Sequence, residues 1–130
     1  MLEPPPQQDH AARQVVQSAY AVHVALGPGL LESVYEHCLV HELGLRGATV
    51  RRQVAVPITY KDAHLDAGLR MDLVVDDLVV VKVKAVEKLL PVHQAQVLTY
   101  LRLSRMRLGI LVNFNVPLLK NGIHRLILPM

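Results

Sequence analysis

The sequence predicts an α/β fold, a mixed central β-sheet flanked by helices, in the order αα-βββ-α-ββ. Three observations support this fold class. Two N-terminal stretches carry apolar residues at three- and four-residue spacing, the middle of the chain alternates apolar and polar residues, and a third helical stretch precedes two short strands. The 130 residues suit a single domain that can bury its own core.

The N-terminal region is predicted to contain a leader and two helices. Residues 1–9 are rich in proline and are expected to be a disordered leader, so that residues 10–130 form the domain. The first helix is predicted over 10–26 and ends at the glycines of residues 27–29. The second is predicted over 30–45, with Gly44 and Gly47 as caps.

The remaining elements outside the central hairpin follow from alternation and from proline positions. A strand is predicted over residues 49–60, with Pro57 marking an edge or a bulge. Pro91 opens a third helix that runs to about Arg105. Two strands, over 108–114 and 123–128, complete the sheet.

A charged hairpin occupies the centre of the predicted sheet. Its strands cover residues 70–75 and 78–84, and they are apolar except for a few charges. If the connection spans about three residues, Asp72 lies directly across from Lys82. Charges in an apolar hairpin are costly unless they pair or bind a ligand, so we expect the chemistry here. Because side chains alternate along a strand, Asp72 is predicted to lie on the same face of the sheet as Val74. Lys82 and Lys84 are predicted to lie on the same face as Val80.

Composition narrows the class of protein. Hydrophobic residues make up 52% of the chain, but charges interrupt them before any run reaches the roughly 18 residues of a membrane span. The N-terminus lacks the basic start and apolar core of a signal peptide. The single cysteine, Cys38, excludes an internal disulfide. We therefore expect a cytoplasmic protein that does not enter a membrane.

The net charge of +3 is modest, but basic residues cluster locally. Arg102, Arg105 and Arg107 are the candidate contacts to a nucleic-acid backbone. The alternative is that such clusters are solvated helix rims. The large aliphatic content is also consistent with a homodimer.

Several side chains have the chemistry that metal-dependent phosphodiester hydrolysis requires. Such hydrolysis uses oxygen ligands for the cation and a positive charge near the phosphate. Asp72 and Glu32 could supply the oxygen ligands, and Lys84 the charge. Gln96 could face the same cleft in a polar stripe with His93 and Tyr100. Each residue also has a purely structural alternative. Asp72 could form a salt bridge, Glu32 could complement the helix dipole, and the stripe that contains Gln96 could be a solvent-exposed helix face.

Several blocks of the sequence together resemble a known family. Gly29-Leu30-Leu31-Glu32-Ser33-Val34-Tyr35 is similar to the GxxExxY motif of a family of small bacterial and archaeal proteins. Later blocks of that family resemble 70–72, 84–89, 93–96 and 113–115 of this chain, in the same order. The resemblance spans about residues 15–128.

The GxxExxY family resembles a compact form of the PD-(D/E)XK nuclease-like superfamily. The resemblance implies a hydrolase architecture that uses Mg²⁺ or Mn²⁺ on DNA or RNA. It implies that Glu32 and Asp72 are metal ligands, that Lys84 is the catalytic lysine, and that Gln96 is the glutamine of the helix after the core.

The chain departs from this pattern at position 82. The motif has Glu two residues before the lysine, whereas this chain has Lys82, which cannot ligate a cation. We expect Lys82 to pair with Asp72 and to occupy the metal position, so that no cofactor binds. Glu87 could return a carboxylate, but we expect it in the exposed turn before the third helix, paired with Lys88.

Three functions are therefore compared. The first is a Mg²⁺-dependent nuclease. The second is a nuclease-like protein in which Lys82 impairs hydrolysis, and this is the function that the sequence favours. The alternative is a non-catalytic module on the same fold that binds nucleic acid or assembles as a dimer.

Overall fold

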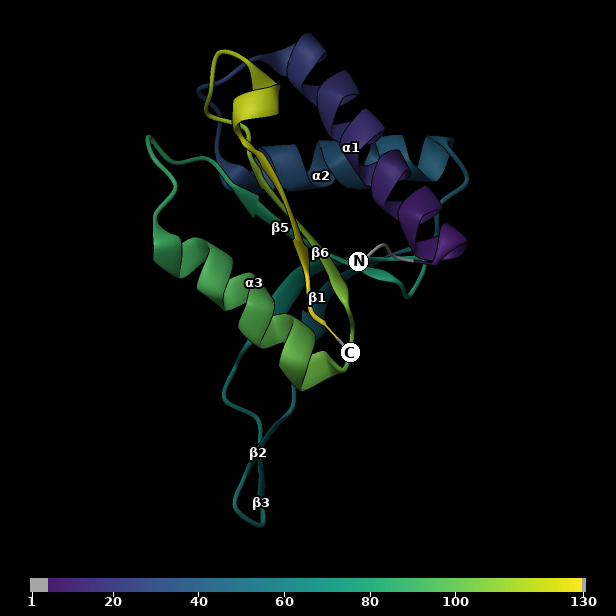
Figure 1. The fold of residues 1–130 in the computed structure, drawn as a ribbon. Coiled ribbons are helices and arrows are strands. Elements are labelled where there is room, and N and C mark those ends of the chain that lie inside the picture. The colour runs from purple at the N-terminus through teal and green to yellow at the C-terminus, as the bar shows by residue number, and fades with distance from the viewer. Residues whose placement is uncertain (1–4, 130) are drawn as a thin grey trace.

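The computed structural model describes residues 5–129 and contains a five-stranded mixed sheet between two helical layers (Figure 1). Helices α1 and α2 cover one face of the sheet, and α3 covers the other. This architecture confirms the predicted fold class. The helices are α1 (Pro6–Leu26), α2 (Glu32–Leu45) and α3 (Pro91–Ser104), and the strands of the large sheet are β1 (Val50–Ala55), β4 (Arg70–Val75), β5 (Val79–Lys84), β6 (Leu108–Asn113) and β7 (Ile123–Ile127).

The sheet has the strand order β1-β4-β5-β6-β7. Strands β5 and β6 are parallel and are joined by α3, whereas the other neighbouring pairs are antiparallel. Because β5 and β6 run in the same direction, their carboxyl ends lie at the same edge of the sheet. Ligands of open α/β sheets bind outside such carboxyl ends.

Two apolar clusters hold the layers together. The larger one joins α1 and α2 to one face of the sheet and includes Leu73, Val81 and Ile110. The smaller one packs α3 on the other face. Gly109 permits this second contact, because a Cβ atom there would lie 2.6 Å from Cγ1 of Val97 on α3.

The hairpin of β4 and β5 has the predicted register. Asp76 and Asp77 both have φ of 54°, which is the left-handed conformation of a tight hairpin turn. Leu73 pairs with Val81, so the next residues along, Asp72 and Lys82, stand opposite one another. The two strands stop pairing at this point, and their ends diverge beyond it.

Two predicted boundaries are wrong. The strand predicted over 49–60 ends at Ala55, and the residues after Pro57 form a separate hairpin of β2 (Ile58–Tyr60) and β3 (Ala63–Leu65) that projects from the domain (Figure 1). Pro57 interrupts the ladder because proline has no N–H to donate. The predicted leader is wrong at residues 6–9, which belong to α1 because proline fits the first helical turn. Residues 1–4 of that leader lie outside the described residues.

None of the helices between residues 5 and 129 combines the length and the apolar character that crossing a bilayer requires.

Candidate functional site

The strand alternation breaks at Asp72. Leu73 lies in the α1–α2 cluster, so regular alternation would put Met71 there too, yet Met71 packs in the cluster on the α3 side. The neighbouring strand breaks at the same level, because Gln53, opposite Asp72, has φ of 49°. The expectation that Asp72 shares the face of Val74 is therefore wrong, and Asp72 instead lines a pocket formed with α2.

The start of α2 is fixed by Tyr35. Its hydroxyl donates to the carbonyl of Gly27 at 2.5 Å and accepts from the N–H of Leu30 at 3.2 Å. Its ring stacks on Phe114 at 4.5 Å between centroids. This arrangement holds Glu32 at the first turn of α2, where its carboxylate accepts from the N–H of Ala85, just beyond β5, at 3.1 Å.

Three carboxylates meet in a pocket of about 280 Å³, which we call the acidic pocket. It is lined by Glu32, Ser33, Glu36, Gln53, Asp72 and Val83. Two elements contribute its acids, because Glu32 and Glu36 lie one turn apart on α2 and Asp72 comes from β4.

The acids of the acidic pocket all accept hydrogen bonds from the protein. Asp72 accepts from the N–H of Val83 at 2.8 Å. Glu36, which is only 8% exposed, accepts from Arg52 at 2.7 Å and from the amide of Gln53 at 2.9 Å. Glu32 is engaged by the backbone after β5, as described above. The hydrogen-bonding capacity of these acids is therefore directed largely to the fold.

Lys82 approaches Asp72 from the neighbouring strand. Its Nζ lies 3.6 Å from Oδ1 of Asp72, and the two side chains are 16% and 15% exposed. The two groups form an ion pair, but the distance between them is too long for a hydrogen bond. Burial raises the pKa of Asp72, while the Val83 N–H and the Lys82 ammonium oppose that shift.

Lys84 lies two residues further along β5. Val81 and Val83 belong to the α1–α2 cluster, so alternation starts Lys82 and Lys84 on the face of Val80, as predicted. The Lys82 ammonium nevertheless reaches Asp72, because the two residues lie just beyond the last pair of the β4–β5 ladder. Lys84 is in register with Asn113 of β6. Between residues 5 and 129, its side chain makes no ion pair or hydrogen bond.

Gln96 does not join the acidic pocket. It is exposed on α3 and lines a separate hollow with Leu69 and Val92. Of the expected stripe, Tyr100 lines the same hollow as Gln96, although most of its side chain is buried in the α3-side cluster. His93 does not line that hollow, and its Nδ1 accepts a hydrogen bond from the N–H of Leu90. The structure thus brings Glu32 and Asp72 together and leaves Gln96 apart.

The predicted arginine contacts lie at the other end of the sheet. Arg102 and Arg105 lie at the end of α3, and Arg107 directly precedes β6. The start of β6 is paired with the start of β5, whereas Lys84 lies at the far end of β5. The length of β6, six residues or roughly 17 Å, separates these arginines from that end, so they cannot contact the same phosphate as Lys84.

The donor set as placed does not fit a divalent cation. Such an ion needs several oxygen ligands converging on one point. Oδ1 of Asp72 faces an ammonium group, and Glu36 is committed to Arg52 and Gln53. Within the described part of the chain, no three His, Cys, Asp or Glu side chains form a group that could hold a metal ion. Glu87 offers no replacement, because it is exposed in the loop before α3, as expected; it makes no ion pair with Lys88 there.

Sequence reasoning missed the hydrogen-bonded pair of the acidic pocket, Glu36 and Gln53. The signal for Glu36 was available, because it lies four residues after Glu32 and so on the same face of the helix. Gln53 gave no such signal, because its role depends on the irregular backbone opposite Asp72.

The fold and the site together define a nuclease-like α/β protein, whose central hairpin carries an aspartate and a lysine where its strands diverge. A comparison with family models matches the PD-(D/E)XK nuclease superfamily over residues 9–126. The chain therefore belongs to the PD-(D/E)XK nuclease superfamily. Searches of curated proteins and of solved structures found no match.

Proposed function

We propose that this chain is a GxxExxY-type member of the superfamily that binds DNA or RNA but in which Lys82 impairs Mg²⁺-dependent phosphodiester hydrolysis. One observation carries the proposal: the Lys82 ammonium lies 3.6 Å from Oδ1 of Asp72, beside the expected metal ligand. In this proposal, Glu32 and Asp72 are the remaining members of a metal site that lacks its third ligand.

Electrostatics supports the impairment. Two unit charges about 4 Å apart interact by about 4 kcal/mol at an effective dielectric constant near 20. Replacing a carboxylate with an ammonium changes the local charge by two units, and a divalent ion would be repelled by Lys82 instead of attracted. The ion pair with Asp72 also engages a carboxylate oxygen that the cation would need.

Binding to a nucleic-acid backbone requires no metal. Lys84 has no hydrogen-bond or ion-pair partner within residues 5–129, and Lys82 makes one ion pair, with Asp72 at 3.6 Å. A phosphate at the diverging ends of β4 and β5 could therefore interact with both ammonium groups. In this proposal, Gln96 and the arginines 102, 105 and 107 can contact only other parts of a longer nucleic acid.

A cleavage assay tests the impairment. The unaltered chain, Lys82→Glu and Lys82→Met are incubated with single- and double-stranded DNA and RNA in Mg²⁺ or Mn²⁺. We expect cleavage only by Lys82→Glu, since the methionine removes the ammonium without supplying a ligand. Cleavage by the unaltered chain that Asp72→Ala abolishes would contradict the proposal.

A binding assay tests the proposal that the chain binds nucleic acid. We expect the unaltered chain to bind oligonucleotides with an affinity that falls as salt rises, because phosphate contacts release counterions. Lys84→Ala should weaken this binding without unfolding the protein. Absence of binding at low salt would overturn the nucleic-acid proposal and favour a dimeric assembly module on the same fold.

A further inference from the structure

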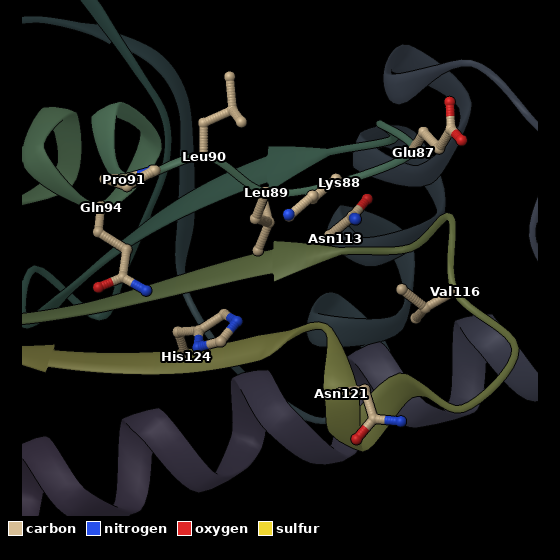
Figure 2. Close-up of a pocket in the computed structure, with 10 residues that line it drawn as sticks. All are labelled: Glu87, Lys88, Leu89, Leu90, Pro91, Gln94, Asn113, Val116, Asn121 and His124. Atoms are coloured by element: carbon tan, nitrogen blue, oxygen red, sulfur yellow. The ribbon is translucent and has the colours of Figure 1, made fainter.

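A second pocket, of about 470 Å³, opens beyond the end of β5 and has no assigned role (Figure 2). It combines amide and imidazole side chains with apolar ones, and we call it the amide pocket. Its lining residues are Glu87, Lys88, Leu89, Leu90, Pro91, Gln94, Asn113, Val116, Asn121 and His124.

The amide pocket lies where this fold class binds ligands. Its walls come from the loop after β5, the first turn of α3, the end of β6, and β7 with the turn before it. It therefore lies outside the carboxyl ends of the parallel strands β5 and β6. Lys84 is in register with Asn113, a wall residue, so the proposed phosphate contact borders the pocket.

The wall at Asn113 is built by the protein itself. Asn113 is 2% exposed, and its amide donates to the carbonyl of Val86 at 2.9 Å. Its carbonyl oxygen accepts from the N–H groups of Val86 at 3.0 Å and Asn115 at 3.2 Å. These bonds fix the loop between β5 and α3, so the pocket is preformed.

The other polar side chains of the pocket are free. Those of Lys88, Gln94, Asn121 and His124 make no hydrogen bond or ion pair with any residue from 5 to 129. In Figure 2 the amide of Gln94 points from α3 toward the imidazole of His124 on β7, and Leu89 lies between α3 and β6. The pocket thus presents unused donors and acceptors next to an apolar surface.

We propose that the amide pocket binds one unpaired nucleotide of the nucleic acid held at Lys84. This inference rests on the proposed function and names its recognition site. Gln94 and His124 offer donors and acceptors of the kind that read base edges. Leu89 offers an apolar surface to a base, and the Lys88 ammonium can contact a phosphate.

The size and polarity of the pocket favour a nucleotide over a simple anion. A volume of about 470 Å³ falls in the range of roughly 300–1,000 Å³ that is typical of small-molecule sites. A site for phosphate alone would not need apolar lining residues such as Leu89 and Val116.

The test is a titration of the full chain, labelled with ¹⁵N, with AMP, CMP, GMP and UMP in the absence of divalent metal. We expect at least one mononucleotide to shift the resonances of residues 87–94 and 121–124 in a saturable manner. Gln94→Ala and His124→Ala should each weaken that binding about tenfold, the size of one lost hydrogen bond. The matched control is Gln7→Ala, an exposed helical glutamine away from the pocket.

Ribose 5-phosphate and inorganic phosphate, which lack a base, are titrated as controls to show whether the pocket recognises the base or only the phosphate. If either shifts the same resonances with the affinity of the best mononucleotide, the site is a phosphate site and the proposal is overturned. If no mononucleotide shifts them at saturation, it is overturned as well. Neither result depends on cleavage or on Lys82, so failure here is distinguishable from failure of the proposed function.

Discussion

The acidic pocket and the amide pocket lie near the same end of β5, but their polar groups are used in opposite ways. In the acidic pocket, each of the three acids accepts a hydrogen bond from the backbone or a side chain. In the amide pocket, Gln94 and His124 are without partners among the described residues, and only Asn113 is fully engaged.

This difference distinguishes polar residues that stabilise the fold from polar residues that are available to bind a ligand. Polar groups that satisfy one another inside a domain contribute to its stability, and removing one leaves its partner unsatisfied. Polar groups without internal partners contribute little to folding and are available to a ligand. Substitutions in the acidic pocket should therefore affect unfolding, whereas substitutions in the amide pocket should affect binding.

The largest expected effect is on the support of the acidic pocket. Tyr35→Ala removes a fully buried ring that stacks on Phe114 and a hydroxyl that bonds the loop before α2. We expect the free energy of unfolding to fall by about 3–5 kcal/mol, the range for truncation of a buried aromatic ring. Chemical denaturation measures it. Tyr35→Phe, which keeps the ring, should lose only about 1 kcal/mol, and an equal loss in both variants would contradict the role of the ring.

Glu36→Ala should have the next largest effect. It removes the buried carboxylate that accepts from Arg52 and Gln53, and we expect a loss of about 1.5–3 kcal/mol in unfolding free energy, the range for hydrogen bonds to a charged group. Glu42→Ala is the matched control on the same helix, because its exposed pair with Arg46 is worth only about 0.2–1 kcal/mol. Equal losses in the two variants would show that the acidic pocket is not part of the stabilising core.

A smaller, pH-dependent effect is expected at Asp72. Its pKa is raised by burial, so the protonated form is favoured in the folded state. The contribution of this group to stability is then fully present below its ordinary pKa and is lost as the pH rises through the raised value. As the pH rises from 4 to 8, the unfolding free energy of Asp72→Asn should therefore increase relative to that of the unaltered chain. The opposite trend would mean that the Lys82 ammonium outweighs burial.

The smallest effect on stability is expected in the amide pocket. Gln94→Ala and His124→Ala should each change the unfolding free energy by less than about 0.5 kcal/mol, as surface substitutions do. Denaturation of both variants beside Glu36→Ala tests the contrast directly. A loss in either variant as large as that of Glu36→Ala would remove the distinction between the two pockets.

The sequence predicted the layers and the central hairpin well because these depend on local periodicity. The spacing of apolar residues located all three helices, and the short turn placed Asp72 opposite Lys82. The hairpin of β2 and β3 was missed because each strand has only three residues and follows Pro57. Such short segments carry no periodic signal.

The candidate site was predicted less completely, for a physical reason. Regular alternation assigned Asp72 to the wrong face, because the irregular backbone at Gln53 and Asp72 cannot be read from residue types. The amide pocket was not predicted, since only the parallel pairing of β5 with β6 brings its loop, helix and strand segments together.

Calorimetry of metal binding tests the central claim, that Lys82 occupies the position of a metal ligand, most directly. Mn²⁺ and Mg²⁺ are titrated into the unaltered chain, Lys82→Glu, and Lys82→Glu combined with Asp72→Ala. We predict saturable binding by Lys82→Glu alone, because only that variant places a carboxylate beside Asp72 without the opposing ammonium. Saturable binding by the unaltered chain that Asp72→Ala abolishes would contradict the account.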